Sequence, residues 1–166
     1  MYRGSFCGYL GRNEASHRLL GEAAALAEEA GLLELLGDIY LCHGFTFFRQ
    51  ADYISSTALY QSALNLCDRV DSGHLRGHGL WGIGKNLMIR SRYQEALPWL
   101  EKSLAVFEAE DSPLSVATVW SELAVCYLGM GDDQKAVELF RRCEQVDYEA
   151  GLMHGYQIDL ANITRA

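Results

Sequence analysis

Apolar residues recur along the chain at the three- and four-residue steps that place them on one face of a helix. Between Pro113 and Gly129 these positions are Val116, Val119, Trp120, Leu123 and Tyr127. We expect Ser112 to cap this helix, with Pro113 at the first helical position. Gly131 and Asp132 then interrupt the pattern, because glycine adopts the positive φ that ends helices. A second amphipathic stretch follows, with Ala136, Val137, Leu139, Phe140 and Cys143 on one stripe.

The same pairing of two helices is predicted earlier in the chain. It covers Asp38–Arg49 with Tyr53–Val70, and Leu75–Arg90 with Tyr93–Glu108. No segment alternates between apolar and polar residues over the length of a strand. The pattern therefore predicts an all-α chain.

The two-helix pattern repeats with a period of about 40 residues. A small residue recurs at one place in the first helix of each unit (Gly44, Gly84, Ala124) and at one place in the second (Ser56, Ala96, Ala136). A fixed period of this size predicts one α-solenoid domain, 1–166, of about four helix pairs plus a terminal helix. We place the units at approximately 1–31, 32–71, 72–111 and 112–151, with a partial fifth at 152–166. Both ends look cut from a longer array, so we expect self-association through an exposed end or a further domain.

The composition narrows the class of protein. Hydrophobic residues make up 49% of the chain, and no apolar run is long enough to span a membrane. The first residues lack the apolar core of a signal peptide. The five cysteines are odd in number and widely spaced, which favours free buried thiols in a reducing, cytoplasmic setting. A net charge of −8 disfavours direct contact with nucleic acid.

Two glycine motifs and a pair of histidines resemble nucleotide- or metal-binding sites, and all are better explained as parts of a helix. Gly77–Gly82 matches G-x-G-x-x-G, and Gly79–Asn86 nearly matches a phosphate-binding loop, but no strand precedes either motif. His74 and His78 are four residues apart, yet no third metal ligand lies at a suitable step. We therefore expect no catalytic residue, no metal and no cofactor, although a phosphate or metal near Gly79–Lys85 would restore the enzyme hypothesis. His43 is interpreted as a hydrogen-bonded core residue.

The glycines of this segment also predict a soft helix. Gly73, Gly77, Gly79, Gly82 and Gly84 would each weaken it by roughly 1 kcal/mol relative to alanine.

The pattern W-x-x-L-A-x-x-Y…G-D-x-x-x-A-x-x-x-F in Trp120–Phe140 resembles the tetratricopeptide repeat. The resemblance covers essentially the whole chain and is strongest in the fourth unit. The usual period is 34 residues, so the additional six fit a longer second helix, as in arrays of bacterial signalling and transcription-regulator proteins. The resemblance implies a right-handed solenoid whose concave groove binds a protein or peptide partner.

The resemblance also implies that the groove is lined by first-helix residues facing away from the second helix. Those predicted to bind a partner are Leu41, Phe45, Phe48, Arg49, His78, Trp81, Lys85, Met88, Ile89, Glu122, Val125 and Asn162. Exposed aromatic residues and methionines mark binding surfaces. The alternative is that these side chains are buried against the first helix of the adjacent unit or by end-to-end self-association.

The family's carboxylate clamp requires Lys and Asn where this chain has Cys42, Gly82 and Glu122. A clamp is therefore not expected, and an apolar or amphipathic helical segment fits the surface better than an acidic tail.

Two functions follow as hypotheses. The first is a non-enzymatic interaction module, a fragment of a larger signalling or regulatory protein, that binds a peptide or amphipathic helix. The second is the small-ligand or signal-peptide sensor domain of a bacterial transcription regulator.

Overall fold

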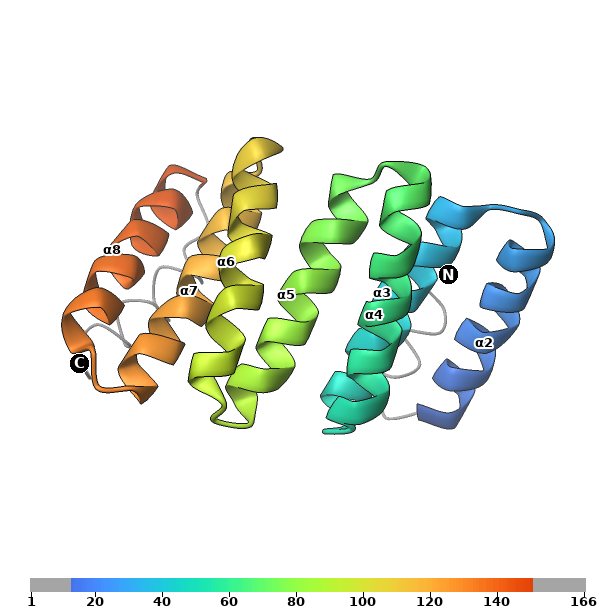
Figure 1. Cartoon of the computed structure of the whole chain (residues 1–166), viewed down its shortest axis with the longest axis horizontal. Helices are drawn as coiled ribbons and strands as arrows, with labels where there is room; N and C mark the ends of the chain where they lie inside the picture. The colour runs from blue at the N-terminus through green and yellow to red at the C-terminus, as the bar shows by residue number, and fades with distance from the viewer. Residues whose placement is uncertain (1–12, 151–166) are drawn as a thin grey trace. The chain divides into compact units, whose positions relative to one another are not determined.

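The computed structural model describes residues 13–150, which form only helices and the short turns between them (Figure 1). The helices are α2 (Asn13–Glu29), α3 (Leu33–Arg49), α4 (Tyr53–Val70), α5 (Gly73–Ile89), α6 (Tyr93–Ala109), α7 (Pro113–Gly129) and α8 (Asp133–Glu149). The predicted all-α fold of helix-turn-helix repeats is confirmed. The expected first helix of the first unit and the partial fifth unit lie outside the described residues.

Consecutive helices begin 20 residues apart, so two of them make one 40-residue unit. Each of the six turns between them contains one residue with positive φ: Gly31, Ala51, Asp71, Ser91, Asp111 and Gly131. In the last turn the Asp132 N–H donates to the Tyr127 carbonyl at 2.9 Å, and the Gly131 N–H donates to Leu128 at 3.0 Å. This pair of bonds is the Schellman motif, which satisfies carbonyls at a helix end.

Two helices begin earlier than the sequence pattern predicts. Helix α3 starts at Leu33 rather than Asp38, and α5 starts at Gly73 rather than Leu75. Leu36 is 3% exposed, so the first turn of α3 contributes to the core and extends the helix toward Gly31. Ser112 lies at the predicted N-cap of α7, but its hydroxyl bonds the Ser115 hydroxyl at 2.9 Å instead of a backbone N–H.

The chain divides into two compact units, Met1–Asn86 and Leu87–Ala166. In the first unit, α2, α3 and α4 share a core of Leu20, Ala27, Leu36, Ile39 and Leu66. Helix α5 packs on α4 at its glycines, because a Cβ on Gly82 would lie 2.5 Å from the Tyr60 ring and one on Gly79 2.8 Å from Leu64. The glycines that weaken α5 as an isolated helix therefore allow it to approach α4 closely.

In the second unit, α7 packs against both α6 and α8. Phe140 is fully buried in a cluster with Ala124 and Ala136, two of the repeated small residues. The Cys143 thiol donates to the Ala117 carbonyl at 3.2 Å.

Among residues 13–150, no two cysteines are joined by a disulfide bond. Cys67, Cys126 and Cys143 are buried, Cys42 is partly buried, and Cys7 lies outside the described residues. Burial raises the pKa of the Cys126 thiol to about 12, so this thiol stays protonated and unreactive at neutral pH.

Candidate partner-binding surface

Five of the side chains predicted to line the groove lie together on α3 and α5. We call Phe45, Phe48, His78, Trp81 and Lys85 the α3–α5 surface. The Phe45 and Phe48 rings stack with centroids 6.1 Å apart. Lys85 bridges the two helices, with its Nζ 4.6 Å from the centroid of Trp81 and 5.4 Å from that of Phe48. The surface is therefore a continuous set of rings around one ammonium group.

Helical spacing explains why these side chains meet. Phe45 and Phe48 are three residues apart on α3, and Trp81 and Lys85 are four apart on α5, so each pair shares a helix face. Phe45 is 41% exposed, and the other four side chains are half-buried. A group of partly exposed aromatic side chains is typical of a binding surface.

A histidine pair borders the Trp81 side of this surface. His78 lies edge-on to Trp81 at 6.2 Å and to His74 at 4.6 Å. The Nε2 of His74 lies 3.3 Å from the Asp38 carboxylate. Burial, reinforced by the nearby His74, lowers the pKa of His78 to about 4. His78 is therefore neutral at pH 7 and offers a partner hydrogen bonds rather than charge.

Trp81 carries the unusual polar group of the surface. Its indole Nε1 is buried and has no hydrogen-bond partner. Such groups are rare in folded proteins, because a buried donor without an acceptor loses its bonds to water and gains none.

The other predicted site residues occupy different surroundings. Leu41 is half-buried on α3, and Arg49 and Ile89 are exposed at the ends of α3 and α5. Met88 is only 6% exposed, so its side chain does not contribute to the exposed patch. It lies four residues after the buried Gly84 and shares its helix face.

The described residues among those predicted beyond α5 belong to the second compact unit. Glu122 and Val125 are half-buried on α7. Asn162 lies outside the described residues.

The glycine motifs lie entirely inside α5, which is helical from Gly73 to Ile89. A phosphate-binding loop requires a strand followed by a turn at these residues, and a continuous helix does not provide that geometry. Within residues 13–150, no group of three His, Cys, Asp or Glu side chains is placed to hold a metal.

A second histidine cluster joins α2 to α3 and was not predicted as a unit. His17 Nδ1 lies 2.9 Å from His43 Nε2, and the other nitrogen of His17 lies 2.8 Å from the side-chain nitrogen of Gln50. Phe47 stacks on both imidazoles. Burial, then the neighbouring His17, lowers the pKa of His43 to about 4. His43 is therefore hydrogen-bonded, as predicted, but it is half-buried rather than part of the core.

The sequence signal for this cluster is its spacing. A second-helix residue meets the first helix of the next unit about 30 positions later, as Ser56 meets Asn86. His17 and His43 are 26 positions apart, slightly less than this spacing, and His17 and Gln50 are 33 apart, slightly more.

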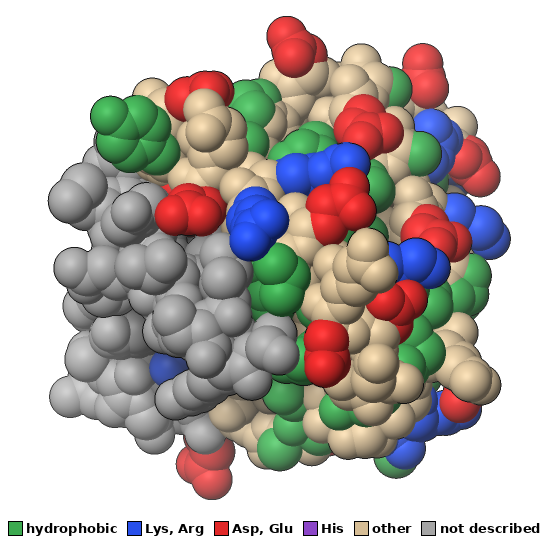
Figure 2. All heavy atoms as spheres, turned by 90° about the vertical axis from the view of Figure 1, so that its left-hand side faces the viewer, with side chains coloured by type: hydrophobic (Ala, Val, Ile, Leu, Met, Phe, Trp, Pro, Cys, Tyr) green, Lys and Arg blue, Asp and Glu red, His purple; other side chains and the backbone are tan. Residues whose placement is uncertain are grey.

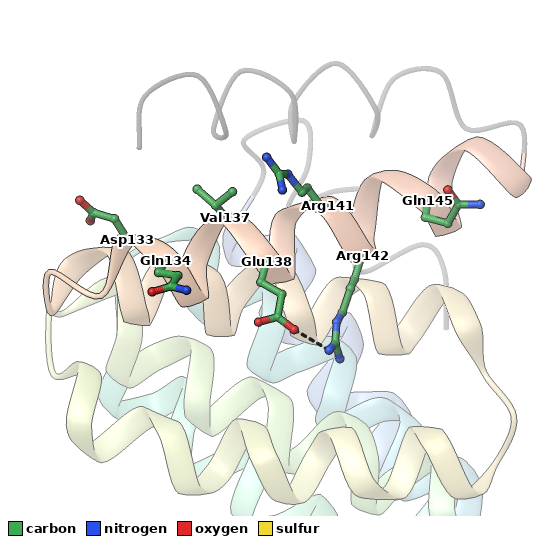
Figure 3. Close-up of a pocket in the computed structure, with 7 residues that line it drawn as sticks. All are labelled: Asp133, Gln134, Val137, Glu138, Arg141, Arg142 and Gln145. Atoms are coloured by element: carbon green, nitrogen blue, oxygen red, sulfur yellow. Dashed lines mark hydrogen bonds and ion pairs between the residues drawn. The ribbon is translucent and has the colours of Figure 1, made fainter.

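A hollow of about 650 Å³ runs along α8, where no site was predicted. Its lining is Asp133, Gln134, Val137, Glu138, Arg141, Arg142 and Gln145 (Figure 3). Arg142 donates to Glu138 at 2.6 Å, and Figure 2 shows acidic and basic side chains interspersed over this end of the molecule. An exposed ion pair with one valine beside it contributes little binding energy, so the α3–α5 surface is the better candidate.

Comparisons with known proteins agree with this fold. Residues 76–149 match the family model for the tetratricopeptide repeat. No curated protein sequence matches the chain. The predicted resemblance to tetratricopeptide repeats is therefore confirmed, and these repeats act in general as scaffolds for protein interactions.

Solved structures share the fold at low identity. Aspartyl phosphate phosphatase F from Bacillus subtilis matches with a TM-score of 0.83 at 19% identity, over 90% of this chain and 39% of that one. The kinesin light chain TPR-like repeats of Podosopora anserina match at 0.77 and 15% identity, over 99% and 81%. The TPR domain of Arabidopsis FLU matches at 0.58 and 23% identity, over 63% and 87%. The chain spans 39% of the phosphatase structure, and these likenesses concern the fold alone.

None of the helices in residues 13–150 combines the length and the apolar character that a membrane crossing requires.

Proposed function

We propose that this chain is a non-enzymatic interaction module of the cytoplasm whose α3–α5 surface binds a peptide or an amphipathic helix of a protein partner. The observation that carries the proposal is the partly exposed Phe45–Phe48 stack beside the Lys85 ammonium group, which lies near the Phe48 and Trp81 rings. Aromatic side chains contribute much of the binding energy at protein interfaces, and an ammonium group over their rings is held there by cation–π attraction.

The remaining predicted residues suggest how far a partner extends. Leu41 and Arg49 continue the α3 face, and Ile89 is 51% exposed at the end of α5. Glu122, Val125 and Asn162 remain predicted contacts for a longer partner.

The test is selection of binding peptides from a displayed random library, followed by measurement of their affinity for variants. Phe45→Ala with Phe48→Ala is expected to reduce affinity at least tenfold, since buried aromatic anchors each contribute on the order of 1–4 kcal/mol at interfaces. Ile54→Ala is the matched control, because Ile54 is 79% exposed on α4. Circular dichroism must show that the double variant remains folded.

Two results would count against the proposal. One is equal binding of the selected peptides to the wild type and to the double variant. The other is unfolding of both Phe48→Ala and Trp81→Ala, which would place these side chains in the core instead.

A small-ligand or signal-peptide sensor is the second candidate. It is supported by a hollow of about 550 Å³ in the first unit, lined by Glu28, Gly31, Leu33, Leu36, Tyr40, Ser62, Leu66 and Arg69. This size and its mixture of apolar walls with a few polar groups suit a small molecule. Thermal stabilisation by a compound library that is lost in Arg69→Ala would favour the sensor, whereas no stabilisation would leave the interaction module.

A further inference from the structure

We propose that the His17–His43 pair is a pH-dependent switch that holds the first half of α2 against α3 while the pair is neutral or carries one positive charge, and releases it when both imidazoles are charged. This inference is independent of the proposed function.

The two imidazoles face each other nitrogen to nitrogen. His17 Nδ1 lies 2.9 Å from His43 Nε2, and the ring centroids are 5.1 Å apart, so both nitrogens lie near the line that joins the rings. Only one hydrogen fits between two nitrogens at this distance. One of the two facing nitrogens must therefore keep its lone pair for the contact to persist.

The surroundings of the pair accept one positive charge. The Nε2 of His17 lies 3.1 Å from Gln50 Oε1 and 2.8 Å from Gln50 Nε2, so the amide can either accept from this nitrogen or donate to it. When His17 is protonated, its Nδ1–H donates to His43 and its Nε2–H donates to Gln50 Oε1, and both contacts are retained. Phe47 stacks on the His17 ring at 4.1 Å and favours a cationic imidazole there.

A second positive charge does not fit this arrangement. With both imidazoles protonated, two N–H groups would point at each other across 2.9 Å with no acceptor between them. Burial of His43 opposes the same proton and, together with the nearby His17, lowers the pKa of His43 to about 4. Because His17 belongs to α2 and His43 to α3, separation of the two helices at this point relieves both penalties.

Other titratable groups lie around the pair on the same helices and on α4. They are Glu14 and Arg18 on α2, Cys42 and Arg49 on α3, Asp52 at the start of α4, and Tyr60 on α4. Cys42 and Tyr60 carry no charge in acid, and Glu14, Arg18 and Arg49 are exposed to solvent, which screens their charges. Asp52 lies near enough to His17 for their charges to interact. Its one carboxylate offsets one imidazolium and leaves a second uncompensated.

Release is confined to the first half of α2. His17 lies in the second turn of this helix, whereas Ala27, near the other end, is 3% exposed in the core that α2 shares with α3 and α4. Leu20 lies one turn after His17 and is 1% exposed in the same core. The acid form therefore opens α2 from its start as far as Leu20 and uncovers part of that core.

The experiment is amide hydrogen exchange of the whole chain followed by NMR, with protection corrected at each pH for the exchange of an unfolded chain. The reporters are the amides of residues 17–20, because the first N–H groups of a helix have no helical partner. Between pH 6.5 and about 4 the opened form binds one more proton than the closed form, so protection of the reporters is expected to fall about tenfold per pH unit. Low concentrations of urea should accelerate exchange in α4, which requires global unfolding, and leave the reporters unaffected.

Two variants separate the pair from general acid destabilisation. His43→Gln keeps a hydrogen-bonding group opposite His17 and cannot take up a proton, so its reporters should lose the tenfold response. His78→Gln is the matched control, because the pKa of His78 is also about 4 and this residue lies on α5, outside the pair. Its reporters should respond as in the wild type.

The inference is overturned if reporter protection in the wild type does not depend on pH, or if it falls equally in His43→Gln. Parallel acceleration of the reporters and α4 by urea would also overturn it, because the first unit would then unfold as a whole. If His43→Gln does not fold, wild-type protein labelled with ¹⁵N-histidine decides. The N–H···N bond gives a spin coupling between His17 Nδ1 and His43 Nε2, which must be present at neutral pH and disappear where the reporters open.

Discussion

Asn86 links α5 to α4 through one buried amide. It is 1% exposed, and its nitrogen donates to the hydroxyls of Ser56 at 3.0 Å and Thr57 at 2.9 Å. Forty residues earlier the equivalent pair is Ser16 and Thr46. There the Thr46 hydroxyl donates to the Cys42 carbonyl, and the buried Ser16 hydroxyl has no partner. The same structural position is therefore satisfied in one unit and unsatisfied in another.

This difference predicts opposite effects for one substitution at two equivalent sites. Ser56→Ala removes a partner of the buried Asn86 amide and is expected to lower the free energy of unfolding by about 1–3 kcal/mol. Ser16→Ala removes an unsatisfied hydroxyl and is expected to leave stability unchanged or raise it. Urea denaturation measures both variants, and equal losses would show that Ser16 has an acceptor in solution.

His43 makes the stability of the first unit depend on pH. Its pKa is about 4 in the folded protein and 6.5 as the ordinary value, so the neutral form is favoured by folding. Its contribution is complete above pH 6.5 and is lost as the pH falls from 6.5 toward 4. The neighbouring imidazole is His17 on α2, and hydrogen bonds from Ser55 hold the pKa of Asp52 below its usual value and outside this window.

We therefore expect the unfolding free energy to decline between pH 6.5 and 4, and to decline less steeply in His43→Gln, which does not titrate. His78, whose pKa is also about 4, accounts for part of the remaining slope. Chemical denaturation of both proteins at several pH values gives the comparison. Parallel curves would mean that folding leaves the pKa of His43 unchanged.

At the scale of elements, every turn contains a residue with positive φ, but these residues tolerate that conformation unequally. Ala51 has φ 60° and Ser91 has φ 58°, whereas Gly31 and Gly131 meet the same demand without a Cβ. A non-glycine residue is destabilised in this conformation by steric crowding around its Cβ.

Ala51→Gly and Ser91→Gly are accordingly expected to raise stability by about 0.5–1 kcal/mol each, and Gly131→Ala to lower it by about 1 kcal/mol. Thermal and urea unfolding test this, and a loss of stability in both glycine variants would show that chain entropy outweighs the strain.

The glycines of α5 provide a second contrast between elements. Gly82→Ala places a methyl 2.5 Å from the Tyr60 ring, which is 3% exposed, and should cost about 1–3 kcal/mol despite the better helix propensity. Gly21 lies on an exposed face of α2, where an added Cβ would have nothing within 4 Å. Gly21→Ala should add about 0.5–1 kcal/mol. If both variants gain stability in denaturation experiments, α5 is not packed as closely on α4 as described.

At the scale of the whole molecule, stacked repeats are stabilised mainly by their nearest neighbours, so damage in one unit should remain partly local. Phe140→Ala empties a fully buried site between α7 and α8 and is expected to cost about 3–5 kcal/mol. Hydrogen exchange should accelerate more in α7 and α8 than in α3 and α4. Uniform acceleration along residues 13–150 would instead indicate a single cooperative core.

The helix pairs and their period could be predicted because each helix carries its own apolar stripe and each 40-residue unit repeats it. The 20-residue spacing of the turns was missed, since only Gly31 and Gly131 among the six positive-φ residues are glycines. The resemblance to tetratricopeptide repeats implied that Phe45, Phe48, Trp81 and Lys85 would share a surface, and spacing along α3 and α5 explains why they lie together. Met88 was placed wrongly on the exposed patch, because its helix face is buried by packing that no local pattern records.

The helices of this chain could be predicted from sequence because they depend on residues three or four positions apart, and the spacing of apolar side chains shows that periodicity directly. Which buried groups find partners is a different matter. The pairing of Asn86 with Ser56, the isolation of Ser16, the His17–His43 contact and the unpaired Trp81 indole all depend on how separate helices meet. Only the packing of those helices brings the atoms within the roughly 3 Å at which a hydrogen bond forms or fails to form.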